Sequence, residues 1–125
     1  MNVQSQNTKV DLIENATSFL GLSSYGKIMV GDKAFEYYND RNPKDFIQIP
    51  WEEVDYVSAS VYFKGKWIPR YAIATKTNGM YTFASKEPLK VLKAMKKYVP
   101  ADRLLKSLTF FQVIKRGLAK KKVDA

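Results

Sequence analysis

The stretch DFIQIPWEEVDYV, residues 45–57, decides how this chain folds. Its first half alternates between apolar and polar residues, as a half-buried strand does. One face of that predicted strand carries Ile47, Ile49 and Trp51. Pro50 cannot donate a hydrogen bond to a sheet, so we predict that the strand ends there or lies at a sheet edge. Residues 51–54 are then predicted to form a corner, and a second strand is predicted from Asp55.

Three carboxylates gather at this corner, on Glu52, Glu53 and Asp55. Paired carboxylates act as acid and base when their surroundings separate their pKa values. The chain has no histidine, however, and the corner has neither metal-ligand spacing nor a second acidic cluster nearby. We therefore interpret the stretch as a bend, with Ile49, Trp51 and Val54 facing inward and the three acids facing solvent.

Alternating segments on both sides of the corner predict a β domain of about seven strands, which together with a C-terminal helix spans residues 10–99. The predicted strands cover residues 10–20, 27–30, 34–38, 45–50, 55–63, 67–76 and 80–84. Asn78-Gly79 is a strong hairpin signal, because both residues tolerate the positive φ of a tight turn. Residues 21–26 and 39–44 are typical of turns and loops. Residues 1–9 lack any period and are predicted to form a flexible arm.

At Ser85 the hydrophobic period changes from two to 3.6, which predicts a helix. Ser85 is a candidate cap for this helix, and Pro100 is predicted to end it. Its apolar stripe carries Val91, Leu92, Met95, Tyr98 and Val99. A second helical segment is predicted over residues 100–118, followed by a flexible basic tail over residues 119–125.

The composition removes several kinds of chemistry. The chain has no cysteine, hence no disulfide, thiolate nucleophile or thiolate metal site, and no histidine for proton transfer or metal binding. We therefore expect a non-enzymatic protein that uses no cofactor or metal. The polar N-terminus is unlike a signal peptide, and no run of about 18 apolar residues occurs, so we expect a soluble protein of the cytoplasm.

The formal charge of +9 comes from the last third of the chain. Residues 1–85 hold nine basic and nine acidic residues, whereas residues 86–125 hold twelve basic and three acidic residues, a difference of +9. Such asymmetry predicts an anionic partner, which is an acidic protein face, an anionic membrane surface or nucleic acid.

Three groups of residues are candidates for binding that partner. The predicted helix carries a charged stripe formed by Lys86, Lys90, Lys93 and Lys97. The C-terminal segment combines an aromatic ring with two cations, on Phe111, Lys115 and Arg116. The hairpin VYFKGKWIPR combines rings and a cation, on Tyr62, Trp67 and Arg70. Each group also has a plainer interpretation, as a solvated helix face, a packed helix with a soluble tail, or cross-strand packing.

The order of strands followed by a helix resembles the pleckstrin-homology-like superfold, especially its bacterial and GRAM-type members. The likeness is carried by YGKIMV, AFEYYN, ASVYF, YAIATKTNG and MYTFAS. The corner adds to it, because Ile49, Pro50 and Val54 match an Ile-Pro-x-x-x-Val pattern. The resemblance implies a mainly β fold, in which two antiparallel sheets form a partly open barrel with one or two C-terminal helices.

A closer likeness covers residues 8–118. The segments YGKIMVGDKAFEYYNDRN, DFIQIPWEEVDYV, FKGKWIPR and KYVPADRLLKSLTFFQVIKRG resemble a ManO-like family of small proteins encoded beside mannose-type sugar phosphotransferase operons. This resemblance implies a regulatory role connected with the transporter, and it supplies no catalytic residues.

We therefore expect a cytosolic adaptor or regulator of a mannose-type phosphotransferase transporter. Its basic C-terminal third would bind an acidic surface on a membrane or cytosolic subunit. Two alternatives stay open: a module that binds anionic lipid at the inner face of the cell membrane, and a DNA-binding regulator of the sugar operon. Nucleic acid is the less favoured partner, because the sequence has no convincing recognition helix and no RNA-binding aromatic motif. The oligomeric state is left open.

Overall fold

The computed structural model describes residues 4–62 and 67–107, and over these residues the chain is mainly β, as predicted. The strands are β1 (Val10–Ser18), β2 (Ser24–Gly31), β3 (Ala34–Asn39), β4 (Phe46–Pro50), β5 (Val54–Tyr62), β6 (Trp67–Thr75), β7 (Met80–Ser85) and β8 (Leu104–Ser107). One α-helix, α1 (Pro88–Met95), follows β7 in the described chain. Short 3-10 turns, η1 (Trp51–Glu53) and η3 (Ala101–Arg103), precede β5 and β8.

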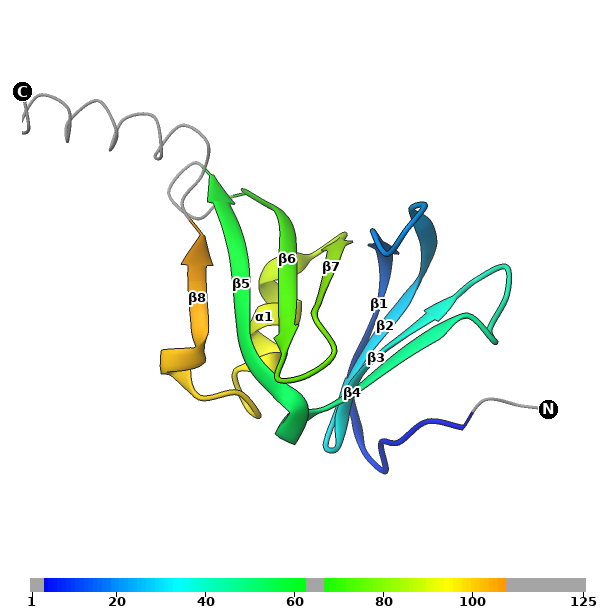
Figure 1. The fold of residues 1–125 in the computed structure, drawn as a ribbon, viewed down its shortest axis with the longest axis horizontal. Coiled ribbons are helices and arrows are strands. Elements are labelled where there is room, and N and C mark those ends of the chain that lie inside the picture. Colours follow the sequence, from blue (N-terminus) through cyan, green and yellow to red (C-terminus); the bar gives the residue numbers. More distant parts are fainter. Residues whose placement is uncertain (1–3, 63–66, 108–125) are drawn as a thin grey trace, which may run out of the picture.

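The strands form one mixed sheet that does not close, in the order β4-β3-β2-β1-β7-β6-β5-β8. Figure 1 shows this sheet as two halves set at an angle, β1–β4 on the right and β5–β8 on the left, with α1 against the left half. β1 belongs to both halves: it pairs with β2 along its length, and with β7 only at residues 16–18. Over the described residues the sheet has eight strands, where about seven antiparallel strands were expected, and the last pairs with β5 in parallel.

The corner in residues 45–57 forms as the sequence predicts. β4 ends at Pro50 and lies at one edge of the sheet, and η1 leads directly into β5. Ile49 and Val54 are buried on either side of the turn. The three acids of the corner, Glu52, Glu53 and Asp55, are exposed to solvent. The bend therefore inserts its apolar residues into the core and leaves its carboxylates outside.

Trp51 lies in η1 rather than on the β4 strand. Its Nε1 donates a hydrogen bond of 2.7 Å to the main-chain oxygen of Gly31, at the end of β2. Its ring stacks on that of Tyr98, with 5.2 Å between the centroids and 11° between the planes. This half-buried indole therefore joins the corner to β2 and to the segment that follows α1.

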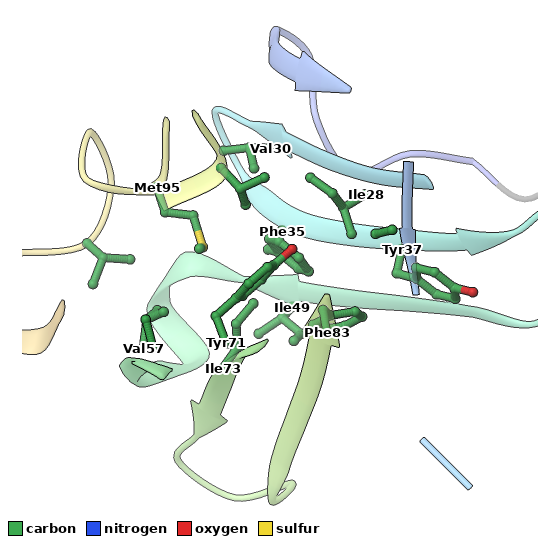
Figure 2. Close-up of a cluster of buried hydrophobic side chains, with 14 of the residues drawn as sticks. Ile28, Val30, Phe35, Tyr37, Ile49, Val57, Tyr71, Ile73, Phe83 and Met95 are labelled. Carbon is green, nitrogen blue, oxygen red and sulfur yellow. The ribbon is translucent and has the colours of Figure 1, made fainter. Parts of the chain in front are cut away.

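Three aromatic rings lie at the centre of the core (Figure 2). The ring centroid of Phe83, on β7, lies 5.1 Å from that of Phe35 on β3 and 6.0 Å from that of Tyr71 on β6. All three side chains are fully buried. Helix α1 adds the buried side chains of Val91 and Met95 from its predicted apolar stripe, so it covers the core from one side.

The predicted start and end of the helix are wrong. Ser85 is the last residue of β7, and its Oγ makes a hydrogen bond of 2.6 Å with the hydroxyl of Tyr71 instead of capping α1. The N-cap is Glu87, without a side-chain hydrogen bond. The helix ends at Met95, because a tight turn follows in which the main-chain N–H of Val99 donates to the Met95 oxygen. This turn still buries Val99 against the core.

The second predicted helix is wrong over residues 104–107, which form β8, whereas residues 101–103 form only the short 3-10 turn η3. Residues 104–107 pair with residues 57–60 of β5, because the open edge of β5 offers main-chain partners that a short isolated helical segment lacks. Leu104 is half-buried and packs against the core, whereas Leu105 is exposed. Residues 108–118 of this prediction, and the predicted tail over 119–125, lie outside the described residues.

The described part of the N-terminal arm, residues 4–9, makes specific hydrogen bonds to the sheet. The carboxylate of Glu36, fully buried on β3, accepts hydrogen bonds from Ser5 Oγ, the main-chain N–H of Gln6 at 2.8 Å and Asn7 Nδ2 at 3.0 Å. These donors replace the water that a buried carboxylate loses. A Cβ on Gly31 would lie 2.3 Å from Cγ of Asn7, so this close approach requires glycine.

The arm also binds Asp32, in the turn between β2 and β3. The hydroxyl of Thr8 and the main-chain N–H groups of Thr8 and Lys9 donate to its carboxylate. These hydrogen bonds, led by that of the Thr8 hydroxyl, lower the pKa of Asp32 to about 2. Asp32 therefore keeps its charge, and its attachment to the arm, down to acid pH.

Candidate partner-binding surface

The four lysines of the predicted stripe lie on the exposed side of α1 and its flanking turns. Lys86 precedes the helix, Lys90 and Lys93 lie within it, and Lys97 follows it. All four are exposed to solvent. The opposite side of α1 is buried in the core, so the sheet fixes which face of the helix points outward. We call these four residues the lysine face.

Two members of the lysine face have acidic partners. Lys90 Nζ lies 3.1 Å from a carboxylate oxygen of Glu87, and Lys97 Nζ lies 3.3 Å from one of Asp11, on β1. Exposed pairs of this kind add little to stability. Lys86 and Lys93 make no ion pair with the described residues, so the face keeps a net positive charge.

Asp11 is shared between this face and the turn after α1. The hydroxyl of Tyr98 donates a hydrogen bond to Asp11, which also binds Lys97. The hydrogen bond lowers the pKa of Asp11 and raises the pKa of Tyr98 to about 12. Both groups therefore hold these charge states across the neutral range, and the end of α1 stays attached to β1.

The structure describes the side chains of two of the three hairpin candidates, Trp67 and Arg70. Trp67 is exposed at the start of β6, and its main chain pairs with that of Tyr62. The guanidinium of Arg70 instead lies over the ring of Phe19, 4.3 Å from its centroid. Arg70 also lines a groove of about 320 Å³ on the outer face of β5–β7. The side chain of Tyr62 and the residues Phe111, Lys115 and Arg116 lie outside the described part of the chain.

One surface that the sequence analysis did not select is the tip of the β1–β2 hairpin, whose connection covers residues 19–23. Leu22 is 94% exposed there, and Leu20 is 56% exposed. A signal was present in the sequence, because FLGL places three large apolar residues around a glycine in a segment that reads as a turn. Exposed apolar residues at a turn are normal singly, but a cluster of them indicates an interaction site.

Glu14, on β1, is a half-buried acid beside the lysine face, and its two carboxylate oxygens are shielded from solvent. It lines a cleft of about 350 Å³ together with Lys86 and Glu87. Neither carboxylate oxygen accepts a hydrogen bond of normal geometry from the described residues, although the main chain of Glu87 lies nearby. Burial raises the pKa of this carboxyl, and the nearby Glu87 main chain opposes the rise only in part.

Replacing Glu14 with glutamine is expected to raise the free energy of unfolding at pH 7 by about 1 kcal/mol, because a desolvated charge is removed. The pKa of this carboxyl is higher in the folded than in the unfolded chain, where it is about 4.3. The increase in the free energy of unfolding should therefore be complete above the pKa of Glu14 in the folded chain, and it should vanish below about pH 4. Urea unfolding across this pH range tests the prediction, with the exposed Glu53→Gln as control. A gain that persisted in acid would contradict it.

The described residues include no group of three or more His, Cys, Asp or Glu side chains placed to hold a metal ion. None of their helices has the length and apolar character needed to cross a membrane.

Comparison with known proteins gives a family and a fold. Residues 2–118 match a family model described as "Domain of unknown function (DUF956)". No curated protein matches the chain. A crystal structure of the C-terminal domain of an unknown protein from Leishmania infantum has a similar fold, with a TM-score of 0.63 and 11% sequence identity. The match covers 72% of this chain and 83% of that one.

Proposed function

The chain belongs to the DUF956 family, a domain of unknown function, and from that premise we propose that it is a non-enzymatic cytosolic adaptor or regulator. Its proposed partner is an acidic surface on a mannose-type phosphotransferase transporter at the membrane. The choice of transporter is supported by the resemblance to ManO-like proteins. The choice of an acidic surface is supported by the lysine face.

The lysine face carries this proposal. A helix that is merely solvated commonly alternates charges, but Lys86 and Lys93 form no ion pair within the described residues. Helix α1 is fixed on the core by Val91 and Met95, so its lysines are presented in a constant arrangement. Charged groups arranged in this way speed association with an oppositely charged surface and select it over neutral ones.

We also interpret the fold as a pleckstrin-homology-like arrangement of the GRAM type. The interpretation is supported by the strand order, in which β1 joins two groups of antiparallel strands, and by the helix that follows β7. The Ile-Pro corner between β4 and β5 agrees with it. In such an arrangement the helix covers one open end of the sheet, which leaves its outer face available to a partner.

Sedimentation with inverted membrane vesicles tests the proposed function. The vesicles come from matched cells with and without the mannose-type transporter, and more of the protein is expected to pellet with the first. The double variant Lys86→Glu/Lys93→Glu should bind about tenfold more weakly, because two attractive charges become repulsive. Raising the salt concentration should weaken binding of the unaltered protein.

The matched control is Lys33→Glu/Lys44→Glu, which changes the net charge equally at two exposed lysines outside α1 and its flanking turns. It should retain binding within about twofold if the position of the charge matters and not only its total. Equal pelleting with both vesicle types, or pelleting with neither, would overturn the transporter proposal. The first outcome would indicate lipid, and the second a soluble partner or DNA.

A further inference from the structure

The tip of the β1–β2 hairpin is an uncharged apolar projection. Residues 16–26, ATSFLGLSSYG, contain no charged side chain. At the tip, Leu22 is 94% and Leu20 is 56% exposed, and Tyr25 behind them is 75% exposed. These side chains form a cluster of exposed apolar residues, which indicates an interaction site more strongly than a single exposed residue does.

The tip is held in place by hydrogen bonds at its base. The main-chain N–H of Phe19 donates to the oxygen of Thr82 at 3.0 Å, which attaches the hairpin to β7. The hydroxyl of Tyr37, in the core, donates to the main-chain oxygen of Ser24 at 3.0 Å. Gly21 has a φ of +65°, which lets the chain turn sharply between the two leucines. The leucines are therefore presented by a defined turn. Binding then loses little conformational entropy, because the turn is already ordered.

A positive charge lies beside this apolar tip. The guanidinium of Arg70 stacks on the ring of Phe19, 4.3 Å from its centroid, at the base of the hairpin. One acid, Asp40, is joined to this hairpin by a hydrogen bond, in which its main-chain N–H donates to the main-chain oxygen of Tyr25. Its carboxylate is paired with Lys27 at 2.9 Å. The surroundings of the tip are therefore neutral or positive.

We propose that the β1–β2 hairpin inserts Leu20 and Leu22 into the interfacial layer of an anionic lipid bilayer, with Arg70 beside the headgroup phosphates. A projecting apolar tip next to a cation matches the change from acyl chain to anionic headgroup, and the net charge of +9 draws the protein to such a surface. A protein pocket would require no flanking cation. This inference deepens the proposed function by naming how the adaptor reaches the membrane, and its test contains no transporter.

Vesicles of phosphatidylcholine, with and without phosphatidylglycerol, provide the first test on the full chain. The unaltered protein should bind only the anionic vesicles. The variant Leu20→Ser/Leu22→Ser should bind them at least about tenfold more weakly, because the transfer of two exposed leucines is lost. The matched control is Leu89→Ser/Leu105→Ser, at leucines that are 57% and 46% exposed on α1 and β8. It should bind within about twofold of the unaltered protein.

Insertion itself can be measured because the chain has no cysteine. A single Leu22→Cys variant labelled with a polarity-sensitive fluorophore should shift its emission to the blue on anionic vesicles. The same label at Leu89→Cys should not. An unshifted label at position 22, or a tip variant that binds as well as the unaltered protein, would overturn the inference.

The two proposals can fail separately. Binding to transporter vesicles without binding to anionic lipid vesicles would sink the membrane-insertion inference and leave the adaptor function standing. Insertion into lipid vesicles together with equal pelleting on both kinds of membrane vesicle would overturn the transporter proposal and leave the membrane-insertion inference standing.

Discussion

Phe83→Ala is expected to lower the free energy of unfolding by about 4 kcal/mol. Phe83 is fully buried, and its ring lies among those of Phe35, Tyr37 and Tyr71, with centroids 5.1, 5.7 and 6.0 Å away. Truncation removes the apolar transfer energy of the ring and leaves a cavity between β3, β6 and β7 that a sheet-bound core cannot fill. The free energy of unfolding of a small domain is about 5–15 kcal/mol, so the expected loss would be a large part of it.

Guanidinium unfolding followed by circular dichroism measures this effect, with Phe83→Leu as the control. Leucine keeps most of the buried volume, so it should cost less than about 1.5 kcal/mol. Similar losses for the two variants, both below about 1.5 kcal/mol, would show that the aromatic cluster around Phe83 is not where the core is most closely packed.

Gly26→Ala is expected to cost about 3 kcal/mol, through a clash with the main chain. A Cβ on Gly26 would lie 2.1 Å from the main-chain oxygen of Tyr38 and 2.8 Å from the hydroxyl of Tyr37. Because Gly26 pairs with β3, β2 would have to move away from its neighbour, and the ladder between the two strands would be strained. Thermal unfolding of the variant measures the loss.

Gly21→Ala separates this steric effect from the general cost of replacing glycine. A Cβ on Gly21 meets nothing within 4 Å, but its φ of +65° is unfavourable for alanine. Its expected cost is about 1 kcal/mol, from backbone strain alone. If Gly26→Ala cost no more than Gly21→Ala, the close approach of β2 and β3 would be too loosely packed to matter.

The parts of the fold that the sequence predicts are those with local signals. The Ile49-Pro50 pattern placed the end of β4, and Asn78-Gly79 placed the β6–β7 turn, where Gly79 has a φ of +79°. Both depend on the backbone preferences of the residues themselves. The apolar stripe of α1 was equally visible, because a helix repeats its buried face along the sequence.

The segment after α1 could not be predicted in this way. Leucine-rich residues 104–107 favour a helix locally, but the free edge of β5, almost fifty residues earlier, turns them into a strand. The buried charge of Glu36 was equally hidden, because its partners come from the N-terminal arm. Long-range pairing of this kind leaves no periodic trace in the sequence.

The candidate surfaces differ in the same way, because some depend on local sequence and others on contacts between distant segments. The lysine face follows from a local spacing along α1 and its flanking turns, so the sequence predicts it. The contact of Arg70 with Phe19 joins two strands that are distant in sequence. The exposure of Leu22 depends on which residues the rest of the fold leaves uncovered, and no local sequence pattern predicts this.

The position of β8 at the edge of β5 has a consequence for how the protein is made in the cell. Synthesis runs from the N-terminus, so the strands of both halves and α1 leave the ribosome before the segment that pairs with β5. Until residues 104–107 emerge, the nascent chain exposes a long unpaired strand, the kind of surface that chaperones shield. When β8 pairs with β5, the strand at this edge of the sheet is no longer the nine-residue β5 but the four-residue β8. The edge strand is therefore shorter. Emergence of residues 104–107 and protection from association between nascent chains are thus one event.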